Sequence, residues 1–245
     1  EILSCLVGSE MCIRDSMIYP ILYSFKRCPY AMRARMALHL AEIKCEIREI
    51  RLSNKPEQML EVSPKGTVPI LVLEDKVIDE SYDIVNWVIE QSNIFNDNLE
   101  LDQIDLTESL IKKFDDEFKH HLDRYKYATR YENTDSDFHR AECLKILVDL
   151  EATASNDKWI FGENLNKLDI SILPFIRQFR IANPEWFDSL EEISRIKKIL
   201  NNYLDSEEFK KIMFKYDEWE LGAKPVYFPS TCLLYTSPSP RDMTG

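Results

Sequence analysis

The chain of 245 residues contains only 5 glycines, and its basic side chains are outnumbered by its acidic ones. So few glycines argue against glycine-rich phosphate loops and low-complexity arrays. With 31 basic against 43 acidic residues the formal net charge is -12, which argues against a sequence-independent nucleic-acid binder, because such a protein needs a basic face. No apolar run approaches the roughly 20 residues of a membrane-spanning helix. The sequence therefore predicts a cytoplasmic protein that handles small molecules, with neither nucleic acid nor membrane as a partner.

Both ends of the sequence differ in character from the rest. Residues 1–16 and 229–245 include runs that resemble translated sequencing-library adapters. Neither run has a helical or strand period that continues into its neighbour, and the leader lacks the sustained apolar centre of a signal peptide. We therefore expect Met17 to be the natural start and leave both ends out of the fold.

The cysteines do not form a disulfide or metal pattern. Outside the two ends there are three of them, Cys28, Cys45 and Cys143, an odd and widely spaced set. Such a set does not resemble a disulfide framework, and it lacks the paired spacing of a zinc site. Cys45 and Cys143 fall in strand and helix patterns, where we expect core residues.

Residues 17–92 alternate between strand and helix patterns. The expected strands cover residues 21–24, 45–50, 67–73 and 76–79. The expected helices cover residues 29–42, 56–62 and 81–91. The order β-α-β-α-β-β-α predicts an α/β domain in which one small sheet is covered by helices.

After a polar stretch the patterns become helical, with no convincing strand from Asp102 to Trp219. Asn166 and Asp169 form a capping box at the start of an apolar helix. We therefore predict a second, all-helical domain over residues 102–228. The adjacent His120 and His121 are not spaced as metal ligands on one helix face, so we interpret them as surface histidines and predict no metal site.

Cys28 lies between the first strand and the helix that Pro29 opens. The unpaired N–H groups of a helix start favour an anion, and Lys26 and Arg27 add positive potential, so we expect a depressed thiol pKa and a nucleophilic thiolate. Ala31 stands where a second cysteine could resolve a disulfide, so an external thiol must complete any redox cycle. The alternative is an inert core cysteine.

Two further motifs favour ligand binding. Pro69 cannot donate to a sheet ladder and must lie at an edge or a strand start. A cis Val68–Pro69 bond would turn the backbone of Val68 outward to pair with an extended peptide, and a trans edge proline is the alternative. Ser81 can cap a helix whose N-terminus suits a carboxylate, and Glu80 beside it could hold an ammonium group. The alternative is a helix cap without a ligand.

A thiolate, an exposed strand backbone and a cradle for a carboxylate and an ammonium group are the parts needed to hold a γ-glutamyl tripeptide thiol. At this point the chain resembles the cytosolic glutathione S-transferases of the cysteine type, the omega-like classes and their bacterial relatives, over residues 17–227. The motifs that carry the resemblance are Phe25–Tyr30, Asn54–Glu57, Thr67–Pro69 and Glu80–Ser81. The resemblance implies a thioredoxin-like N-terminal domain, an all-α C-terminal bundle and a homodimer.

The resemblance also assigns roles to individual residues. Cys28 would be catalytic, with glutathione as co-substrate and no metal. Lys55 would contact the glycine carboxylate of glutathione. Val68 would pair with its cysteinyl part, with Pro69 cis. Its γ-glutamyl end would be held by Glu80 and Ser81.

Three functions stay open. The first is thiol transfer or glutathione-dependent reduction of small oxidants such as dehydroascorbate, in which Cys28 forms a mixed disulfide with glutathione. The second is conjugation of glutathione to an electrophile, which a tyrosine or serine would favour. The third is a noncatalytic, transferase-like binding module. The presence of Cys28 favours the first, with a small disulfide or electrophile as the second substrate.

Overall fold

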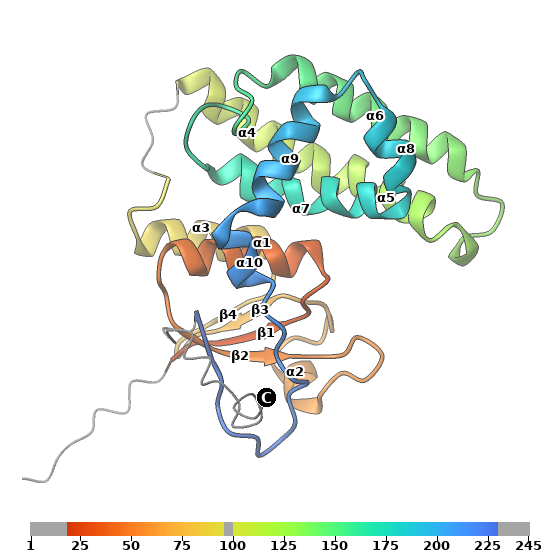
Figure 1. Cartoon of the computed structure of the whole chain (residues 1–245). Helices are drawn as coiled ribbons and strands as arrows, with labels where there is room; N and C mark the ends of the chain where they lie inside the picture. Colours follow the sequence, from red (N-terminus) through yellow and green to blue (C-terminus); the bar gives the residue numbers. More distant parts are fainter. Residues whose placement is uncertain (1–18, 96–99, 230–245) are drawn as a thin grey trace, which may run out of the picture.

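The computed structural model of the chain describes residues 19–95 and 100–229. The leader over residues 1–16 and the tail from residue 230 lie outside the described residues, so the expectation for them stays a prediction. The described part has two layers of structure, a small sheet with its own helices and a larger helical bundle (Figure 1). Among the described helices, none is long and apolar enough to cross a membrane.

The N-terminal part follows the predicted order β-α-β-α-β-β-α. Its strands are β1 (Ile21–Ser24), β2 (Cys45–Glu49), β3 (Ile70–Val72) and β4 (Val77–Ile78). Its helices are α1 (Pro29–Leu40), α2 (Glu57–Val62) and α3 (Ser81–Gln91). The strands β1 and β2 are parallel, whereas β3 runs antiparallel to β1 and β4 antiparallel to β3. The thioredoxin-like α/β prediction is therefore confirmed.

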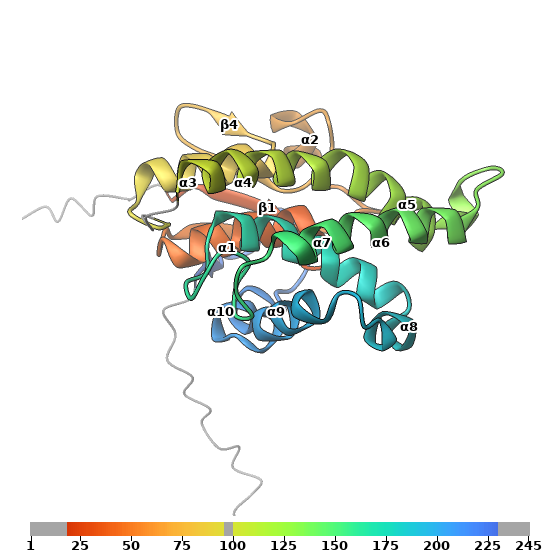
Figure 2. The same ribbon diagram turned by 90° about the horizontal axis from the view of Figure 1, so that it is seen from above.

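The two faces of the sheet are covered by different helices. Alternate residues of β1 and β3 point to opposite faces, as the strand period requires. Leu22 and Leu71 belong to the large core under α1 and α3, while Tyr23 and Ile70 pack with Met59 of α2 in a smaller cluster. The helices α1 and α3 thus lie between the sheet and the bundle (Figures 1 and 2).

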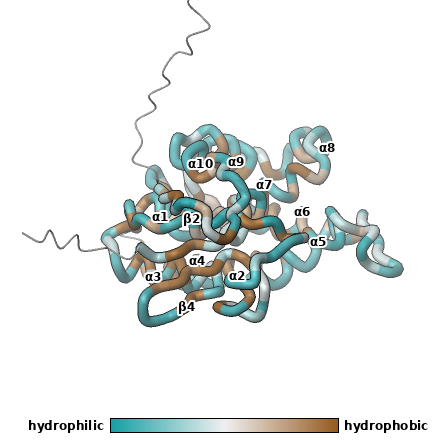
Figure 3. The backbone as a smooth tube through the Cα atoms, turned by 90° about the horizontal axis from the view of Figure 1, so that it is seen from below, coloured by the Kyte–Doolittle hydropathy of each residue, from teal (hydrophilic) through white to brown (hydrophobic). Residues whose placement is uncertain are grey.

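The helical part begins at a capping box on Glu100. Its members are α4 (Leu101–Lys113), the π-helical turn η1 (Phe114–Phe118), α5 (Lys119–Lys126), the short 3-10 turn η2 (Ala128–Arg130), α6 (Ser136–Thr153), α7 (Lys167–Ala182), α8 (Pro184–Ser189), α9 (Ser194–Asp205) and α10 (Glu207–Ile212). The all-helical prediction for this part is confirmed. Hydrophobic residues gather toward the centre of the molecule, and hydrophilic ones follow the outer loops (Figure 3).

The helix α1 is the centre of this arrangement. It packs against α3, α7 and α10, and every side chain from Ala31 to Leu38 is buried. Because the helix has contacts on several sides, two arginines, Arg33 and Arg35, are buried as well. Arg35 pairs with Glu49 of β2 and donates to the backbone oxygen of Ile212 at 3.0 Å, so one guanidinium connects the sheet to α10.

The segment after α10 leaves the bundle and returns to the sheet. The N–H of Trp219 donates to the backbone oxygen of Glu49 at 2.8 Å, and β5 (Tyr227–Phe228) pairs antiparallel with β2. The sheet order is therefore β4-β3-β1-β2-β5. Residues 214–228, expected to belong to the helical domain, instead complete the N-terminal sheet, because β2 offers an open edge of backbone donors and acceptors.

The predicted capping box at the start of α7 is present. The side chain of Asn166 accepts from the N–H groups of Leu168 and Asp169, at 2.9 and 3.2 Å. In return the fully buried Asp169 carboxyl accepts from the N–H groups of Asn166 and Ile160, each at 3.0 Å. Asp169 thus connects the helix start to the preceding loop.

The burial of Asp169 predicts a dependence of stability on pH. Burial raises the pKa of Asp169 to about 7, whereas an unfolded aspartate has a pKa of about 3.9. The folded state therefore favours the protonated carboxyl, and this contribution to stability is lost as the pH rises from about 4 to about 7. We expect the difference in unfolding free energy between wild type and Asp169→Asn, measured by urea titration, to shrink over that interval and then to level off.

The control for this measurement is Asp157→Asn. The pKa of Asp157 is lowered by its contacts with Lys198 and Arg195, so its titration falls below the interval. A difference for Asp169→Asn that grows or stays constant between pH 4 and 7 would contradict the prediction.

Candidate active site

The predicted site residues line one cavity. This cavity has a volume of about 640 Å³ and is bounded by the start of α1, the loop before β3 and the start of α3. Its size suits a small-molecule ligand, because such pockets typically measure about 300–1,000 Å³. The residues that sequence reasoning placed here and that the structure brings together are Cys28, Lys55, Val68, Pro69, Glu80 and Ser81.

Cys28 lies at the N-cap position of α1, and Pro29 is the first helical residue, as the sequence predicts. The thiol is partly buried and donates to the backbone oxygen of Val68 at 3.6 Å. The N–H groups of Tyr30 and Ala31 are directed toward the sulfur. The other two cysteines in the described part, Cys45 and Cys143, are fully buried in the core. Within the described residues, Cys28 is thus the cysteine that a ligand can reach.

The expectation of a depressed thiol pKa is wrong for this cavity. Burial raises the pKa of the Cys28 thiol, and this effect exceeds the lowering by the N–H groups of Ala31 and Tyr30 and by Lys119 and Arg33. The helix start lowers the pKa, as predicted. However, the free energy that the thiolate loses with its hydrating water exceeds the stabilisation that the two backbone N–H groups provide. The charged side chains that lower this pKa are Lys119 and Arg33, whereas the sequence predicts Lys26 and Arg27. The Arg27 guanidinium lies over the Phe25 ring.

The loop before β3 has the backbone conformation that the resemblance implies. The Val68–Pro69 peptide bond is cis. Gly66, two residues earlier, has a φ of +61°, and a side chain there would meet Lys55 and Leu60 at 3.3 and 3.1 Å. A glycine at this turn therefore leaves room for Lys55 beside the cavity.

The start of α3 differs in one respect from the prediction. Glu80, rather than Ser81, is at the N-cap position, and its side chain makes no capping hydrogen bond. Ser81 is buried, and its hydroxyl accepts from the Arg33 guanidinium at 3.2 Å. Glu80 does meet an ammonium group, because Lys65 lies 2.8 Å from its carboxylate and 2.9 Å from that of Asp79.

Arg33 and Asp115 are site residues that sequence reasoning missed. The Arg33 side chain is fully buried. It forms a bidentate ion pair with Asp115 of η1, with N···O distances of 2.9 and 3.1 Å. It also donates to the backbone oxygen of Ser171 in α7 at 2.8 and 3.2 Å. One guanidinium therefore connects the sheet domain to the bundle at the wall of the cavity. The available signal was an arginine on the apolar face of the helix over residues 29–42.

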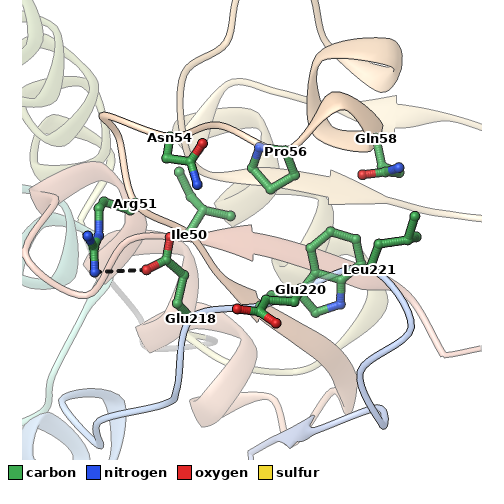
Figure 4. Close-up of a pocket in the computed structure, with 9 residues that line it drawn as sticks. Ile50, Arg51, Asn54, Pro56, Gln58, Glu218, Glu220 and Leu221 are labelled. Carbon is green, nitrogen blue, oxygen red and sulfur yellow. Dashed lines mark ion pairs between the residues drawn. The ribbon is translucent and has the colours of Figure 1, made fainter.

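A second, smaller cavity lies between the loop after β2 and the returning C-terminal segment. It has a volume of about 240 Å³, and Arg51 and Glu218 pair beside it at 3.0 Å (Figure 4). Its lining residues are Ile50, Arg51, Asn54, Pro56, Gln58, Glu218, Trp219, Glu220 and Leu221. None of these is a cysteine or histidine, so the nucleophile belongs to the larger cavity.

The sequence is similar to those of known proteins. Residues 22–94 match the sequence profile of the family described as "Glutathione S-transferase, N-terminal domain". The chain is 30% identical over 165 residues to the probable glutathione S-transferase parA of Nicotiana tabacum, covering 65% of this chain and 72% of that protein. It is 37% identical over 71 residues to glutathione S-transferase omega-1 of Mus musculus, covering 24% of this chain and 30% of that protein.

The fold is shared with solved structures. A glutathione transferase family member from Pseudomonas fluorescens, crystallised with two glutathione molecules bound, superposes with a TM-score of 0.68. The alignment covers 80% of this chain and 92% of that chain at 17% sequence identity. At this identity the likeness concerns the arrangement of the elements.

The raised pKa of Cys28 is open to direct measurement. We expect the rate of iodoacetamide alkylation at Cys28, followed by peptide mass spectrometry on the full chain, to inflect above about pH 8.5, the value of an ordinary thiol. At neutral pH the group is then mainly the thiol. An inflection clearly below that value would mean that the helix start outweighs burial. Cys45 and Cys143, being fully buried, serve as internal controls that stay unmodified in the folded protein.

The Arg33 contacts predict a large effect on stability. Replacement by methionine keeps the bulk of the side chain but leaves Asp115 and the Ser171 oxygen without their donor. We expect Arg33→Met to lower the free energy of unfolding by about 3 kcal/mol, the scale of a broken buried ion pair. Arg48→Met is the control, because Arg48 pairs with Glu46 at a partly exposed position. Equal losses in the two variants, measured by urea unfolding, would contradict the assigned role.

Proposed function

Because the chain belongs to the glutathione S-transferase family, we propose that it is a glutathione-dependent thiol transferase with Cys28 as its nucleophile. The observation that carries the proposal is the position of the Cys28 thiol. It lies at the start of α1, 3.6 Å from the backbone oxygen of Val68, in a cavity that also holds Lys55 and the start of α3.

The proposed reaction has two thiol–disulfide exchanges. First, the Cys28 thiolate attacks the glutathionyl sulfur of a mixed disulfide between glutathione and a small thiol. The bond between Cys28 and that sulfur forms, the original disulfide bond breaks, and the small thiol leaves and takes a proton. Second, the thiolate of another glutathione attacks the glutathionyl sulfur bound to Cys28. Glutathione disulfide forms and the Cys28 thiolate is regenerated.

Charged groups around Cys28 assist the step in which it ionises. The thiol starts protonated at neutral pH, because burial raises its pKa. Lys119 and Arg33 both favour the thiolate, as do the N–H groups of Tyr30 and Ala31. The same groups stabilise the negative charge that returns to Cys28 when the second exchange releases it.

The remaining residues of the cavity would hold the tripeptide. We assign Val68, with the cis Pro69, to the cysteinyl backbone and Lys55 to the glycine carboxylate. Glu80 and Ser81 would receive the γ-glutamyl end. The ammonium group of the ligand would then take the place of the Lys65 ammonium at Glu80, and this exchange costs little, because exposed ion pairs contribute little to stability.

Conjugation activated by a hydroxyl of β1 is the less favoured alternative. The Tyr23 hydroxyl accepts from Arg48 at 2.7 Å, and the buried Ser24 hydroxyl accepts from Arg35 at 2.7 Å. Both groups are thus engaged in packing, and neither lines the cavity of Cys28. A homodimer and a cytoplasmic location are carried over from the family to this chain as part of the proposal.

Cys28→Ser tests the function. Serine keeps a hydrogen-bond donor at the same place but cannot form a disulfide. With a glutathionylated small thiol as substrate, we expect kcat/KM to fall at least about 10³-fold, the scale on which loss of a nucleophile acts. Glutathione binding, measured by calorimetry, should largely persist.

A panel of substrates separates the alternatives. The wild-type chain should reduce the glutathionylated thiol or dehydroascorbate faster than it conjugates a chloro-nitro-aromatic electrophile. Full thiol transfer in the Cys28→Ser variant would remove this cysteine from the mechanism. Conjugation that is faster than thiol transfer and insensitive to the substitution would favour a hydroxyl-activated transferase.

A further inference from the structure

Three of the four histidines of the chain gather at one place in the helical bundle. His120 and His121 belong to α5, and His139 belongs to the second turn of α6. One ring nitrogen from each lies within 4.8 Å of the others. From the sequence we interpret His120 and His121 as surface histidines, and His120 is exposed while His121 is partly buried. Sequence spacing does not show that α5 and α6 pack together and bring in a third imidazole, 18 residues after His121.

The two closest rings face each other through their nitrogens. Nδ1 of His121 lies 2.7 Å from Nδ1 of His139, and the ring centroids are 4.9 Å apart. Two protonated nitrogens cannot face each other at this distance, so at least one of them presents a lone pair to the other. An unprotonated imidazole nitrogen is the form that binds a metal ion.

The cluster is separate from the cavity of Cys28. None of the three histidines lines that cavity. His121 and His139 are partly buried and His120 is exposed, so the cluster is open to solvent on one side. The ring of Phe138 lies 6.0 Å from that of His121 and forms an apolar border. Neither the proposed thiol chemistry nor the helix packing requires three imidazoles at this point.

We propose that His120, His121 and His139 form a binding site for a divalent transition-metal ion of the zinc type, with water as the fourth ligand. Zinc bound by imidazole has Zn–N distances of about 2.0–2.1 Å in tetrahedral geometry, which places ligand nitrogens roughly 3.3 Å apart. The observed nitrogens, 2.7 Å apart for the closest pair and within 4.8 Å for all three, reach this spacing by rotation of the side chains. Imidazole ligands favour zinc, copper and nickel over calcium or magnesium.

Arg124 opposes the binding of a cation. Its guanidinium lies 2.9 Å from Nδ1 of His120, one helical turn earlier, and it is always charged. A metal ion at the cluster would meet this positive charge and compete with Arg124 for the lone pair of His120. Removal of the charge therefore strengthens metal binding, an effect that damage to the fold would not produce.

The test is a zinc titration of the full chain by calorimetry, after alkylation of its accessible thiols with iodoacetamide. We expect one zinc ion per chain. His121→Gln and His139→Gln should each weaken binding by at least about tenfold, since even loss of an outer-sphere partner costs about 10–100-fold. Arg124→Gln should tighten binding several-fold. His39→Gln is the matched control, because His39 lies on α1, outside the cluster, and its loss should leave the affinity unchanged.

Two results would overturn the proposal. One is the absence of stoichiometric zinc binding by the wild-type chain. The other is an affinity that is equal in the wild type and in the cluster variants. X-ray absorption of the zinc-loaded wild-type chain provides a test that does not depend on whether the variants fold. Three imidazole nitrogens and one oxygen around zinc are expected, and a sulfur ligand or an all-oxygen shell would refute the site.

Discussion

The buried guanidinium of Arg33 is the interaction on which the arrangement of the two halves depends. It pairs with Asp115, donates to the backbone of Ser171 and contacts the Ser81 hydroxyl, so it meets η1, α7 and α3 from its place on α1. A buried arginine is costly unless its donors are satisfied, and here the partners come from both halves of the chain. The need to satisfy these donors therefore fixes how the sheet domain packs against the bundle. It also fixes the wall of the cavity beside Cys28.

The thiol itself shows two opposing effects at one atom. A helix start offers backbone donors to Cys28, while the same packing that orders this helix removes water from the sulfur. Burial prevails in the free protein, so the reactive form is the minor one at neutral pH. The proposed enzyme then depends on Lys119 and Arg33 to stabilise the charge as it develops, and these residues come from the bundle and from α1.

The features that the sequence predicts are those decided by neighbouring residues. The structure contains three such features, each set by residues only a few positions apart. They are the N-cap position of Cys28 before Pro29, the cis bond between Val68 and Pro69, and the cap of α7 by Asn166. The missed features join residues far apart along the chain. Arg33 and Asp115 are 82 positions apart, and local periodicity cannot predict such a pair. The pKa of Cys28 was likewise misjudged because its largest cause is burial, and part of that burial comes from residues distant in sequence, such as Met59 and Val68.

The last strand, β5, has a consequence for how the protein is made. It covers the outer edge of β2, and its residues are Tyr227 and Phe228, near the end of the described chain. During synthesis the N-terminal sheet emerges from the ribosome first, yet the strand that completes it emerges about 180 residues after β2, roughly ten seconds or more later. Throughout that interval β2 presents a bare hydrogen-bonding edge, which makes nascent chains on the same messenger prone to pair with one another.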